Sequence, residues 1–495
     1  MNVRALTRLV FNAPLLAFGA GVLSVLGFAP FGLSPLPLVA LTVLFLLWRE
    51  ASPGRAFLLG WLFGLGLMGV GVFWVRISLN QFGNLSPALA LSFTLLLVVG
   101  MSLYFGLAGW LGRRLAGRTL QALLLLVFPA TWVLAGFPWL ALGYSQIDSP
   151  LAGYAPLGGV YALSWLLALS SGLLALAIKA PGRVRYTALG AGALLWLGGW
   201  LLQHLDWTEP MGEAFRASLV QANIPQQEKW RAEQLLPTLR LYRDLTREHW
   251  DSAVVVWPET AVPALKHQVR ENFLEPLANE ARQHDADVVL GIPIRDPRDG
   301  RYFNALISLG SAEDVYHKRH LVPFGEFMPF KDWLGPLAEL FEVPMSDFSP
   351  SRAARPLLKV GSYAVGASIC YEDAFPAEVL QALPEAAYLI NVSNDAWFGD
   401  SLAPHQHLEI ARMRALESGC YLLRATNTGI SAIIDPKGKL LGTVAAFEQG
   451  VLTREVVPMA GATPYAKLGN EGILALLAVL LGLSLLKRMR ADESE

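Results

Sequence analysis

Cysteine is scarce in this sequence, which has only Cys370 and Cys420 among 495 residues. Neither belongs to a C-x-x-C pair or to a Cys/His cluster of zinc-binding spacing, which argues against a disulfide framework and against a structural metal. Charged residues are also few, at 16% of the chain, and 39 basic residues face 40 acidic ones. Because the charge is nearly balanced, the composition gives no electrostatic reason to expect nucleic acid as a partner.

Apolar residues make up 54% of the chain, which predicts a membrane protein. Eight apolar stretches stand out, most of them close to the roughly 20 residues that a helix needs to cross about 30 Å of hydrocarbon. They run over Leu15 to Phe31, Leu36 to Trp48, Ala56 to Val75, Pro87 to Leu111, Leu120 to Gly136, Gly158 to Ile178, Thr187 to Gln203 and Ile473 to Leu486. The second is short and bounded by prolines, so a tilted or re-entrant element is the alternative there. The first lacks a small-x-small cleavage site, and we expect it to be retained.

Basic residues cluster at alternate ends of these stretches and predict their orientation. The opposite short loops carry only Arg76, whereas one side carries 13 basic residues. These are Arg4, Arg8, Arg49, Arg55, Arg113, Arg114, Arg118, Lys179, Arg183, Arg185, Lys487, Arg488 and Arg490. By the positive-inside rule both termini lie in the cytoplasm, and the long segment between the seventh and eighth stretches lies outside it.

That long segment has the composition of a soluble α/β domain, with most of the charged residues. We therefore predict a membrane domain over residues 1–203 with seven transmembrane helices, a catalytic domain over 204–467, and a last transmembrane helix with a short tail over 468–495. Two helices are expected, over Leu235 to Trp250 and His405 to Ser418. Strands are expected over Ala217 to Val220, Val254 to Trp257, Val288 to Ile292, Ala364 to Ile369, Tyr388 to Val392 and Ser431 to Ile434.

Three motifs in this domain place an ionisable side chain where an apolar strand ends. Glu259 follows Val-Val-Val-Trp-Pro, Lys318 lies in the string from Tyr316 to Glu326, and Cys370 follows Ala-Val-Gly-Ala-Ser-Ile. A cysteine is a good nucleophile only as its thiolate, and its ordinary pKa of about 8.5 calls for a nearby base or cation. Glu259 can accept the thiol proton, and Lys318 can stabilise the thiolate and the oxyanion that forms when a carbonyl is attacked.

With these motifs the sequence resembles the nitrilase, or carbon-nitrogen hydrolase, superfamily, whose Glu-Lys-Cys triad sits on an α-β-β-α sandwich. The string from Tyr316 to Glu326 and the string S-N-D-A-W-F-G from Ser393 to Gly399 are similar to those of the apolipoprotein N-acyltransferase family, as are the flanking spans. At the first strand, the residues that match that family are Gln221, Asn223, Pro225 and Trp230.

The resemblance implies a role for each matching residue. Glu259 is the proton acceptor, Lys318 the oxyanion-side cation and Cys370 the acylated nucleophile. Three supporting residues are implied as well: Glu326 as a second glutamate, Tyr371 through its backbone N–H in the oxyanion hole, and Glu372 beside it.

The reaction implied is ping-pong acyl transfer in the bacterial inner membrane, with the catalytic domain facing the periplasm. A phospholipid, typically phosphatidylethanolamine, gives its acyl chain to Cys370 as a thioester. The α-amine of the diacylglyceryl-cysteine of an apolipoprotein then takes it, which is the last step of lipoprotein maturation. No metal or dissociable cofactor is implied.

Several residues have a structural interpretation beside the functional one. Cys370 alone would more often be a small buried hydrophobe. Cys420 lies in an apolar run without a base and is predicted to be packing, with both thiols free. Glu326 and Glu372 can each satisfy backbone N–H groups, and the string from Ser393 to Gly399 either shapes a pocket or forms a turn.

Two further features stay open or are set aside. The apolar segment from Trp333 to Met345 is either a lid that dips into the bilayer or a helix packed on the domain. His317 and His320 lack a carboxylate or cysteine at ligand spacing, so we do not expect them to bind a metal.

Two other functions compete with acyl transfer. The triad alone also fits a membrane-tethered amidase or nitrilase, although a small soluble substrate would not need eight spans. A transporter with a soluble sensor domain is disfavoured because the apolar stretches carry almost no ionisable residues and no pair of interrupted helices.

Overall fold

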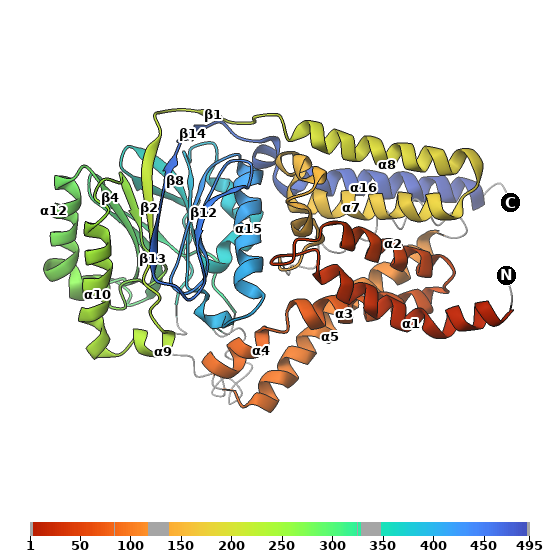
Figure 1. Cartoon of the computed structure of the whole chain (residues 1–495), viewed down its shortest axis with the longest axis horizontal. Helices are drawn as coiled ribbons and strands as arrows, with labels where there is room; N and C mark the ends of the chain where they lie inside the picture. Colours follow the sequence, from red (N-terminus) through yellow and green to blue (C-terminus); the bar gives the residue numbers. More distant parts are fainter. Residues whose placement is uncertain (1–2, 84, 117–137, 324, 328–347, 493–495) are drawn as a thin grey trace. The chain divides into compact units, whose positions relative to one another are not determined.

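The computed structural model describes residues 3–83, 85–116, 138–323, 325–327 and 348–492, and it divides into two compact units. The helical unit contains residues 1–76, 89–205 and 468–495, and the sandwich unit contains residues 77–88 and 206–467. Figure 1 shows both. The predicted span from Leu120 to Gly136 and the apolar segment from Trp333 to Met345 lie outside the described residues.

Long apolar helices make up the helical unit. They are α1 (Val3–Val25), α2 (Pro35–Arg49), α3 (Pro53–Gly71), α5 (Pro87–Ala116), α7 (Ala155–Lys179), α8 (Gly182–Leu202) and α16 (Pro464–Asp492). Shorter elements of this unit are η2 (Leu142–Gln146) and η3 (Pro150–Tyr154). The short helix α4 (Val75–Ile77) ends where the segment 77–88 of the sandwich unit begins, and η1 (Ser78–Phe82) lies in that segment. Among the described residues, three helical segments are long and apolar enough to cross a membrane, within 53–71, 87–114 and 150–179. Helix α2 is regular, but its 15 residues extend only about 22 Å.

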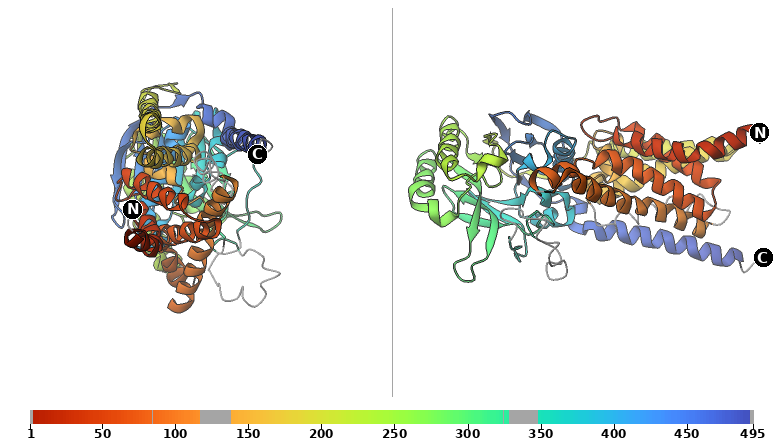
Figure 2. Two further views of the ribbon diagram at one scale, coloured as in Figure 1. Left: turned by 90° about the vertical axis from the view of Figure 1, so that its right-hand side faces the viewer. Right: turned by 90° about the horizontal axis from the view of Figure 1, so that it is seen from below.

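Small residues let these helices approach one another closely. A Cβ atom on Gly21 of α1 would lie 2.0 Å from the carbonyl oxygen of Phe63 on α3, so only glycine fits there. Ser171 of α7 donates a hydrogen bond to the carbonyl of Leu38 on α2, at 3.1 Å. Ala162 of α7 packs against Ile473 of α16. Figure 2 shows the long helices of this unit from two further sides.

Large apolar side chains point outward from the same helices. Leu15, Leu96 and Leu194, on α1, α5 and α8, are 65–72% exposed. A soluble protein rarely exposes apolar surface on so many neighbouring helices, whereas hydrocarbon would cover it at no cost. The helical unit therefore has the surface of a membrane domain.

Two six-stranded sheets build the sandwich unit. The first has the order β13-β2-β3-β4-β5-β6 and the second β12-β11-β10-β9-β8-β7, and β1 (Glu209–Pro210) pairs separately with β14 (Met459–Ala460). The strands of the first are β2 (Phe215–Gln221), β3 (Val254–Val256), β4 (Asp287–Arg295), β5 (Tyr302–Leu309), β6 (Asp314–His317) and β13 (Gly450–Val456). Those of the second are β7 (Leu357–Val360), β8 (Tyr363–Ile369), β9 (Leu389–Ser393), β10 (Leu422–Thr426), β11 (Ser431–Ile434) and β12 (Leu440–Val444).

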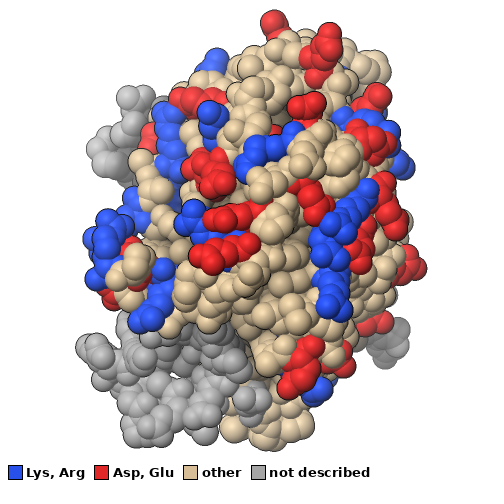
Figure 3. Space-filling view, turned by 90° about the vertical axis from the view of Figure 1, so that its left-hand side faces the viewer, with Lys and Arg blue, Asp and Glu red and all other residues tan. Residues whose placement is uncertain are grey.

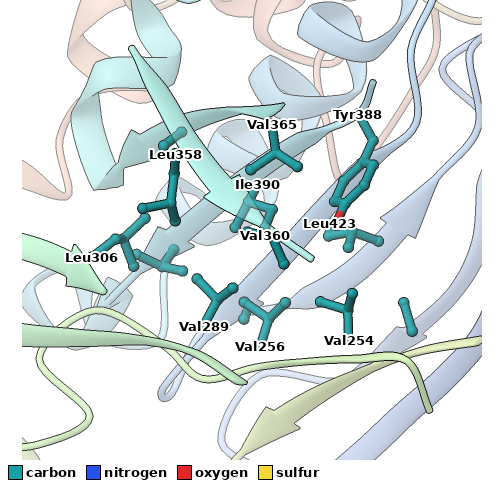
Figure 4. Close-up of a cluster of buried hydrophobic side chains, with 14 of the residues drawn as sticks. Val254, Val256, Val289, Leu306, Leu358, Val360, Val365, Tyr388, Ile390 and Leu423 are labelled. Atoms are coloured by element: carbon teal, nitrogen blue, oxygen red, sulfur yellow. The ribbon is translucent and has the colours of Figure 1, made fainter. Parts of the chain in front are cut away.

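The two sheets face each other across one apolar core, shown in Figure 4. Val256 and Leu306 of the first sheet meet Val365 and Ile390 of the second in this core. Because successive side chains of a strand point to opposite faces, the outer faces need their own cover.

Helices cover both outer faces of the sandwich. On the first sheet the cover is α10 (Ala232–Arg247) and α12 (Glu275–Gln283), and on the second it is α15 (Ala403–Ser418). The remaining helical elements are α9 (Gln226–Lys229), α11 (Lys266–Val269), η4 (Arg270–Leu274), η6 (Cys370–Ala374), α14 (Pro376–Val379), η7 (Leu380–Ala382) and η8 (Asp395–Phe398). The layers are therefore α-β-β-α, as the resemblance implied, and the six predicted strands and two predicted helices are confirmed.

The surface over α10 and α12 carries charges of both signs. Figure 3 shows lysines and arginines interspersed with aspartates and glutamates on this face. Some of them form exposed ion pairs, such as Arg247 with Glu280 at 2.6 Å, and such pairs add little stability. The charges with structural consequence are the buried ones at the strand ends.

Candidate active site

The three predicted catalytic side chains come from both sheets of the sandwich. Glu259 follows β3, Lys318 follows β6 directly, and Cys370 follows β8 as the first residue of η6. All three are nearly buried, with 7%, 1% and 8% of their surface exposed. The Lys318 ammonium lies 3.5 Å from Glu259 Oε1, and its charge acts on the Cys370 thiol.

Two carboxylates share the Lys318 ammonium. Lys318 Nζ donates to Glu326 Oε1 at 2.8 Å, and Asn304 Nδ2 on β5 donates to both glutamates, at 2.7 Å to Glu259 and 3.1 Å to Glu326. The backbone N–H of Asn394 donates to the other oxygen of Glu259 at 3.0 Å. Burial lowers the pKa of Lys318, but the carboxylates of Glu326 and Glu259 outweigh it and raise that pKa above its ordinary value. Lys318 therefore stays charged.

Cys370 has a backbone conformation that is unusual for a side chain with a Cβ atom. Its φ is +53°, in the left-handed region, which costs about 1 to 3 kcal/mol for a residue other than glycine. Burial raises the pKa of its thiol, Glu259 raises it further, and Lys318 opposes both. The resting thiol is therefore protonated at neutral pH, and it needs a base at the moment of attack.

Glu372 connects the Lys318 segment to the Cys370 turn. Its Oε1 accepts hydrogen bonds from the backbone N–H groups of Arg319 and His320, at 2.6 and 3.0 Å. Its Oε2 accepts from the N–H of Ile369 at 2.7 Å, and the Tyr316 hydroxyl contacts both oxygens. Glu372 thus holds backbone, whereas Glu326 contacts Lys318 itself.

The residues around Tyr371 form an aromatic group. The Tyr371 ring lies 5.0 Å from that of Phe375, and His320 stacks on Phe375 at 3.8 Å. His320 Nδ1 also lies 2.8 Å from Glu378 Oε1, while His317 packs against Phe303 at 4.7 Å. The two histidines of the motif therefore serve different packing contacts.

Lys229 was not predicted to be a site residue, although it lies beside Glu259. It is the last residue of α9, is 3% exposed, and donates from Nζ to the backbone carbonyl of Glu259 at 3.1 Å. Burial lowers its pKa to about 8, although Glu259 acts in the opposite direction. Lys229 lies in a polar string that resembles an exposed surface segment, so the sequence does not indicate that it is buried beside Glu259.

A second group of buried charges lies next to Cys370, and only one of its members, Asp395, was singled out from the sequence, within the string from Ser393 to Gly399. We call Asp373, Asp395, His407 and Arg424 the buried quartet; each is at most 1% exposed. Arg424 lies 3.2 Å from Asp373 and 3.0 Å from Asp395, and His407 lies 3.0 Å from Asp373 and 2.9 Å from Asp395. Its members come from four separate elements, η6, η8, α15 and β10, so their spacing in the sequence does not predict that they meet.

The string from Ser393 to Gly399 both forms a turn and shapes the site. It contains η8, its Asn394 contacts Glu259, and its Asp395 is a member of the buried quartet. Ser78 donates to the carbonyl of Trp397 at 2.6 Å, and the Trp397 ring lies 4.9 Å from that of Phe82. The segment 77–88 thus belongs to the sandwich unit, although residues 89–205 separate it in the chain from the rest of that unit.

Cys420 is packing, as predicted. It is 1% exposed in the apolar cluster between the second sheet and α15, and burial raises the pKa of its thiol to about 12. Both cysteines are free.

Comparison with known proteins covers nearly the whole chain. The family model "Apolipoprotein N-acyltransferase N-terminal domain" matches residues 20–173, and "Carbon-nitrogen hydrolase" matches residues 216–465. An apolipoprotein N-acyltransferase of Methylococcus capsulatus is 46% identical over 492 residues, 98% of each chain. This chain belongs to the apolipoprotein N-acyltransferase family. A relative of the same name from Nitrosomonas europaea is 44% identical over 477 residues, 94% of this chain and 95% of the relative.

Solved structures similar to this chain include a Saccharomyces cerevisiae member of the nitrilase superfamily. It is 20% identical, covers 50% of this chain and 91% of its own, and has a TM-score of 0.37. In this chain, the ranges matched by the two family models, residues 20–173 and 216–465, lie on either side of the composition change near residue 204.

Proposed function

We propose that this chain transfers an acyl group from a phospholipid, such as phosphatidylethanolamine, to the N-terminal amine of a diacylglyceryl apolipoprotein, through a thioester on Cys370. The observation that carries the proposal is the meeting of Glu259, Lys318 and Cys370 at the strand ends of the two sheets. Identity of 46% along 98% of an apolipoprotein N-acyltransferase supports the choice of substrates.

In the first half-reaction Cys370 becomes acylated. Glu259 takes the thiol proton as the sulfur attacks the ester carbonyl, and Lys318 with the N–H of Tyr371 stabilises the oxyanion. The ester C–O bond then breaks, and the proton on Glu259 passes to the leaving alkoxide oxygen, which becomes the hydroxyl of the released lysophospholipid.

In the second half-reaction the apolipoprotein amine attacks the thioester carbonyl. Glu259 accepts a proton from the attacking amine, the C–S bond breaks, and that proton returns to the Cys370 sulfur. An amide and the free thiol are the products, so the enzyme returns to its starting state without a metal or dissociable cofactor. Shielding of the thioester from water favours the amine over hydrolysis.

The topology is part of the same proposal. Eight transmembrane helices would hold both termini in the cytoplasm and the catalytic domain, residues 204–467, in the periplasm, with membrane segments 1–203 and 468–495. A membrane-impermeant maleimide tests this in intact cells. Cysteine replacing the exposed Glu213 should be labelled from outside, and cysteine replacing the exposed Arg183 only after permeabilisation. The reverse pattern would reject the orientation.

The chemistry is tested by mass spectrometry after incubation with phosphatidylethanolamine that carries a labelled acyl chain. We expect the label on Cys370 and its transfer to a diacylglyceryl lipopeptide when that peptide is added. Cys370→Ala should abolish both steps, and Cys420→Ala, which removes the other buried thiol, should leave both intact. Ammonia release from a small amide without acyl-Cys370 would identify a hydrolase instead.

A further inference from the structure

The buried quartet carries a balanced set of charges. The guanidinium of Arg424 is always charged, and each ring nitrogen of His407 faces a carboxylate oxygen, Nδ1 at Asp395 and Nε2 at Asp373. Both ring nitrogens can donate only when the imidazole is protonated. Two cations therefore face two carboxylates in a site sealed from solvent.

This group touches the nucleophile at its backbone carbonyl. His407 Nε2 lies 3.3 Å from the carbonyl oxygen of Cys370, and Asn391 Nδ2 donates to the same oxygen at 3.4 Å. Asn391 is itself held, because its Oδ1 accepts from Arg424 at 2.5 Å. Both donors to the Cys370 carbonyl are thus fixed within the quartet or by it.

A second path reaches the thiol. Ser393 Oγ donates to Asp395 Oδ1 at 2.6 Å, and the Ser393 side chain also hydrogen-bonds the Cys370 thiol. Asp373, three residues after Cys370, belongs to the same 3-10 turn as the nucleophile. The quartet therefore holds the Cys370 turn at the Cys370 carbonyl, at the thiol through Ser393, and at Asp373 within the turn itself.

Stability alone gives a weak reason for such a group. Buried ion clusters are often no more stabilising than well-packed apolar side chains of the same volume. Reactive geometry gives a stronger reason, because a nucleophile misplaced by about 1 Å can lose about 100-fold in rate. Cys370 is at risk of such misplacement, since its left-handed backbone must be held by its surroundings.

We propose that Asp373, Asp395, His407 and Arg424 are positioning residues that hold Cys370 in its left-handed conformation and direct its thiol toward Glu259 and Lys318. The inference rests on the proposed function, since it concerns how the acylated thiol is presented. None of the four contacts a substrate in this mechanism.

The test compares His407→Gln with Glu417→Gln in the full-length enzyme. Glu417 is a matched control because it lies on the same helix, is fully buried, and forms an ion pair with Arg414 at 2.9 Å. We expect His407→Gln to slow single-turnover formation of acyl-Cys370, and to lower kcat, by about 10- to 100-fold, with KM for phosphatidylethanolamine unchanged. Glu417→Gln should lower the unfolding temperature comparably and keep the wild-type acylation rate.

A second variant tests the path to the thiol. Ser393→Ala leaves the four charges in place and removes the hydrogen bonds of the Ser393 side chain to Asp395 and to the Cys370 thiol, so it should slow acylation by about 2- to 10-fold. Alkylation of Cys370 by a neutral reagent should slow in both His407→Gln and Ser393→Ala.

The outcomes separate the inference from the function on which it rests. Wild-type acylation rates in His407→Gln, or an equal loss in Glu417→Gln, would overturn the positioning role. If His407→Gln does not fold, Ser393→Ala and Arg424→Lys decide, and wild-type rates in both would overturn it. A wild-type enzyme that forms no acyl-Cys370 would reject the proposed function instead.

Discussion

Two groups of buried charge lie on either side of Cys370, and they differ in charge balance and in exposure. Around Lys318, the carboxylates of Glu259 and Glu326 share one ammonium, and the exposed fractions of their side chains alone are 9% and 14%. In the buried quartet, two cations face two carboxylates, and all four side chains are fully buried. A carboxylate that exceeds the number of cations and lies near solvent can accept a proton. In the buried quartet each carboxylate is matched by a cation and shielded from solvent, so none is available as a base. Burial of charge therefore marks both groups, and the imbalance distinguishes the one fit for acid-base chemistry.

The sharpest test of this comparison is Glu259→Gln. Loss of the base should lower acyl transfer by about 10²- to 10⁴-fold. Stability should hardly change, because Glu326 still neutralises Lys318. Activity and thermal unfolding are measured together, and Glu280→Gln, at the exposed pair with Arg247, is the control. A stability loss without an activity loss would reverse the assignment.

Lys318→Met should have the next largest effect. Removing the oxyanion-side cation should cost about 10²- to 10³-fold in kcat. The two glutamates would then face each other without their cation, so the unfolding temperature should fall as well. Steady-state kinetics and calorimetry check both effects, and Lys318→Arg, which keeps the charge, should recover stability more than activity. Unchanged kcat in Lys318→Met would remove this residue from the mechanism.

For the buried quartet, we expect the main effect in the pH dependence of the free energy of unfolding. Burial and the charge of Arg424 lower the pKa of His407. The carboxylates of Asp373 and Asp395 raise it by more, so the pKa rises to about 9. A raised folded-state pKa gives stability that is complete below the unfolded value of about 6.5 and is lost as pH rises through about 9. The loss should reach roughly 3 kcal/mol.

The measurement is the free energy of unfolding at pH 6.5 and 9.5 for wild type and for His407→Gln. The variant should lack the decrease. Lys229 acts in the opposite direction, because its lowered pKa of about 8 makes its contribution grow with pH above 8, but it is present in both proteins and cancels in the difference. Equal pH dependence in the two proteins would contradict the charged state of His407.

Lys229→Met should have the smallest effect. It removes one hydrogen bond to the backbone carbonyl of Glu259, so kcat should fall by about 2- to 10-fold. Lys229→Arg, which keeps a donor, is the control, and kcat is measured from pH 7 to 9. A loss as large as that of Glu259→Gln would give Lys229 a direct part in the chemistry.

Several features could be predicted because they are local or lie in one motif. Glu259 and Cys370 each follow a predicted apolar strand, and six of the strands, with α10 and α15, follow from short-range patterns. The burial of α15 could not be predicted, since Gln406, Glu409, Arg414 and Glu417 resemble an exposed helix yet are buried. The strands that α15 covers come from distant segments, which a local pattern does not record.

The sequence by itself determined the apolar spans, the change to an α/β domain near residue 204, and the order of the three motifs, because periodicity and composition act over short distances. Only the tertiary structure decided that Lys318 lies between Glu259 and Glu326, that Lys229 supports the Glu259 backbone, and that four separate elements bring their charges together behind Cys370. Those contacts depend on the register of two sheets packed face to face, so they exist only once the chain has folded.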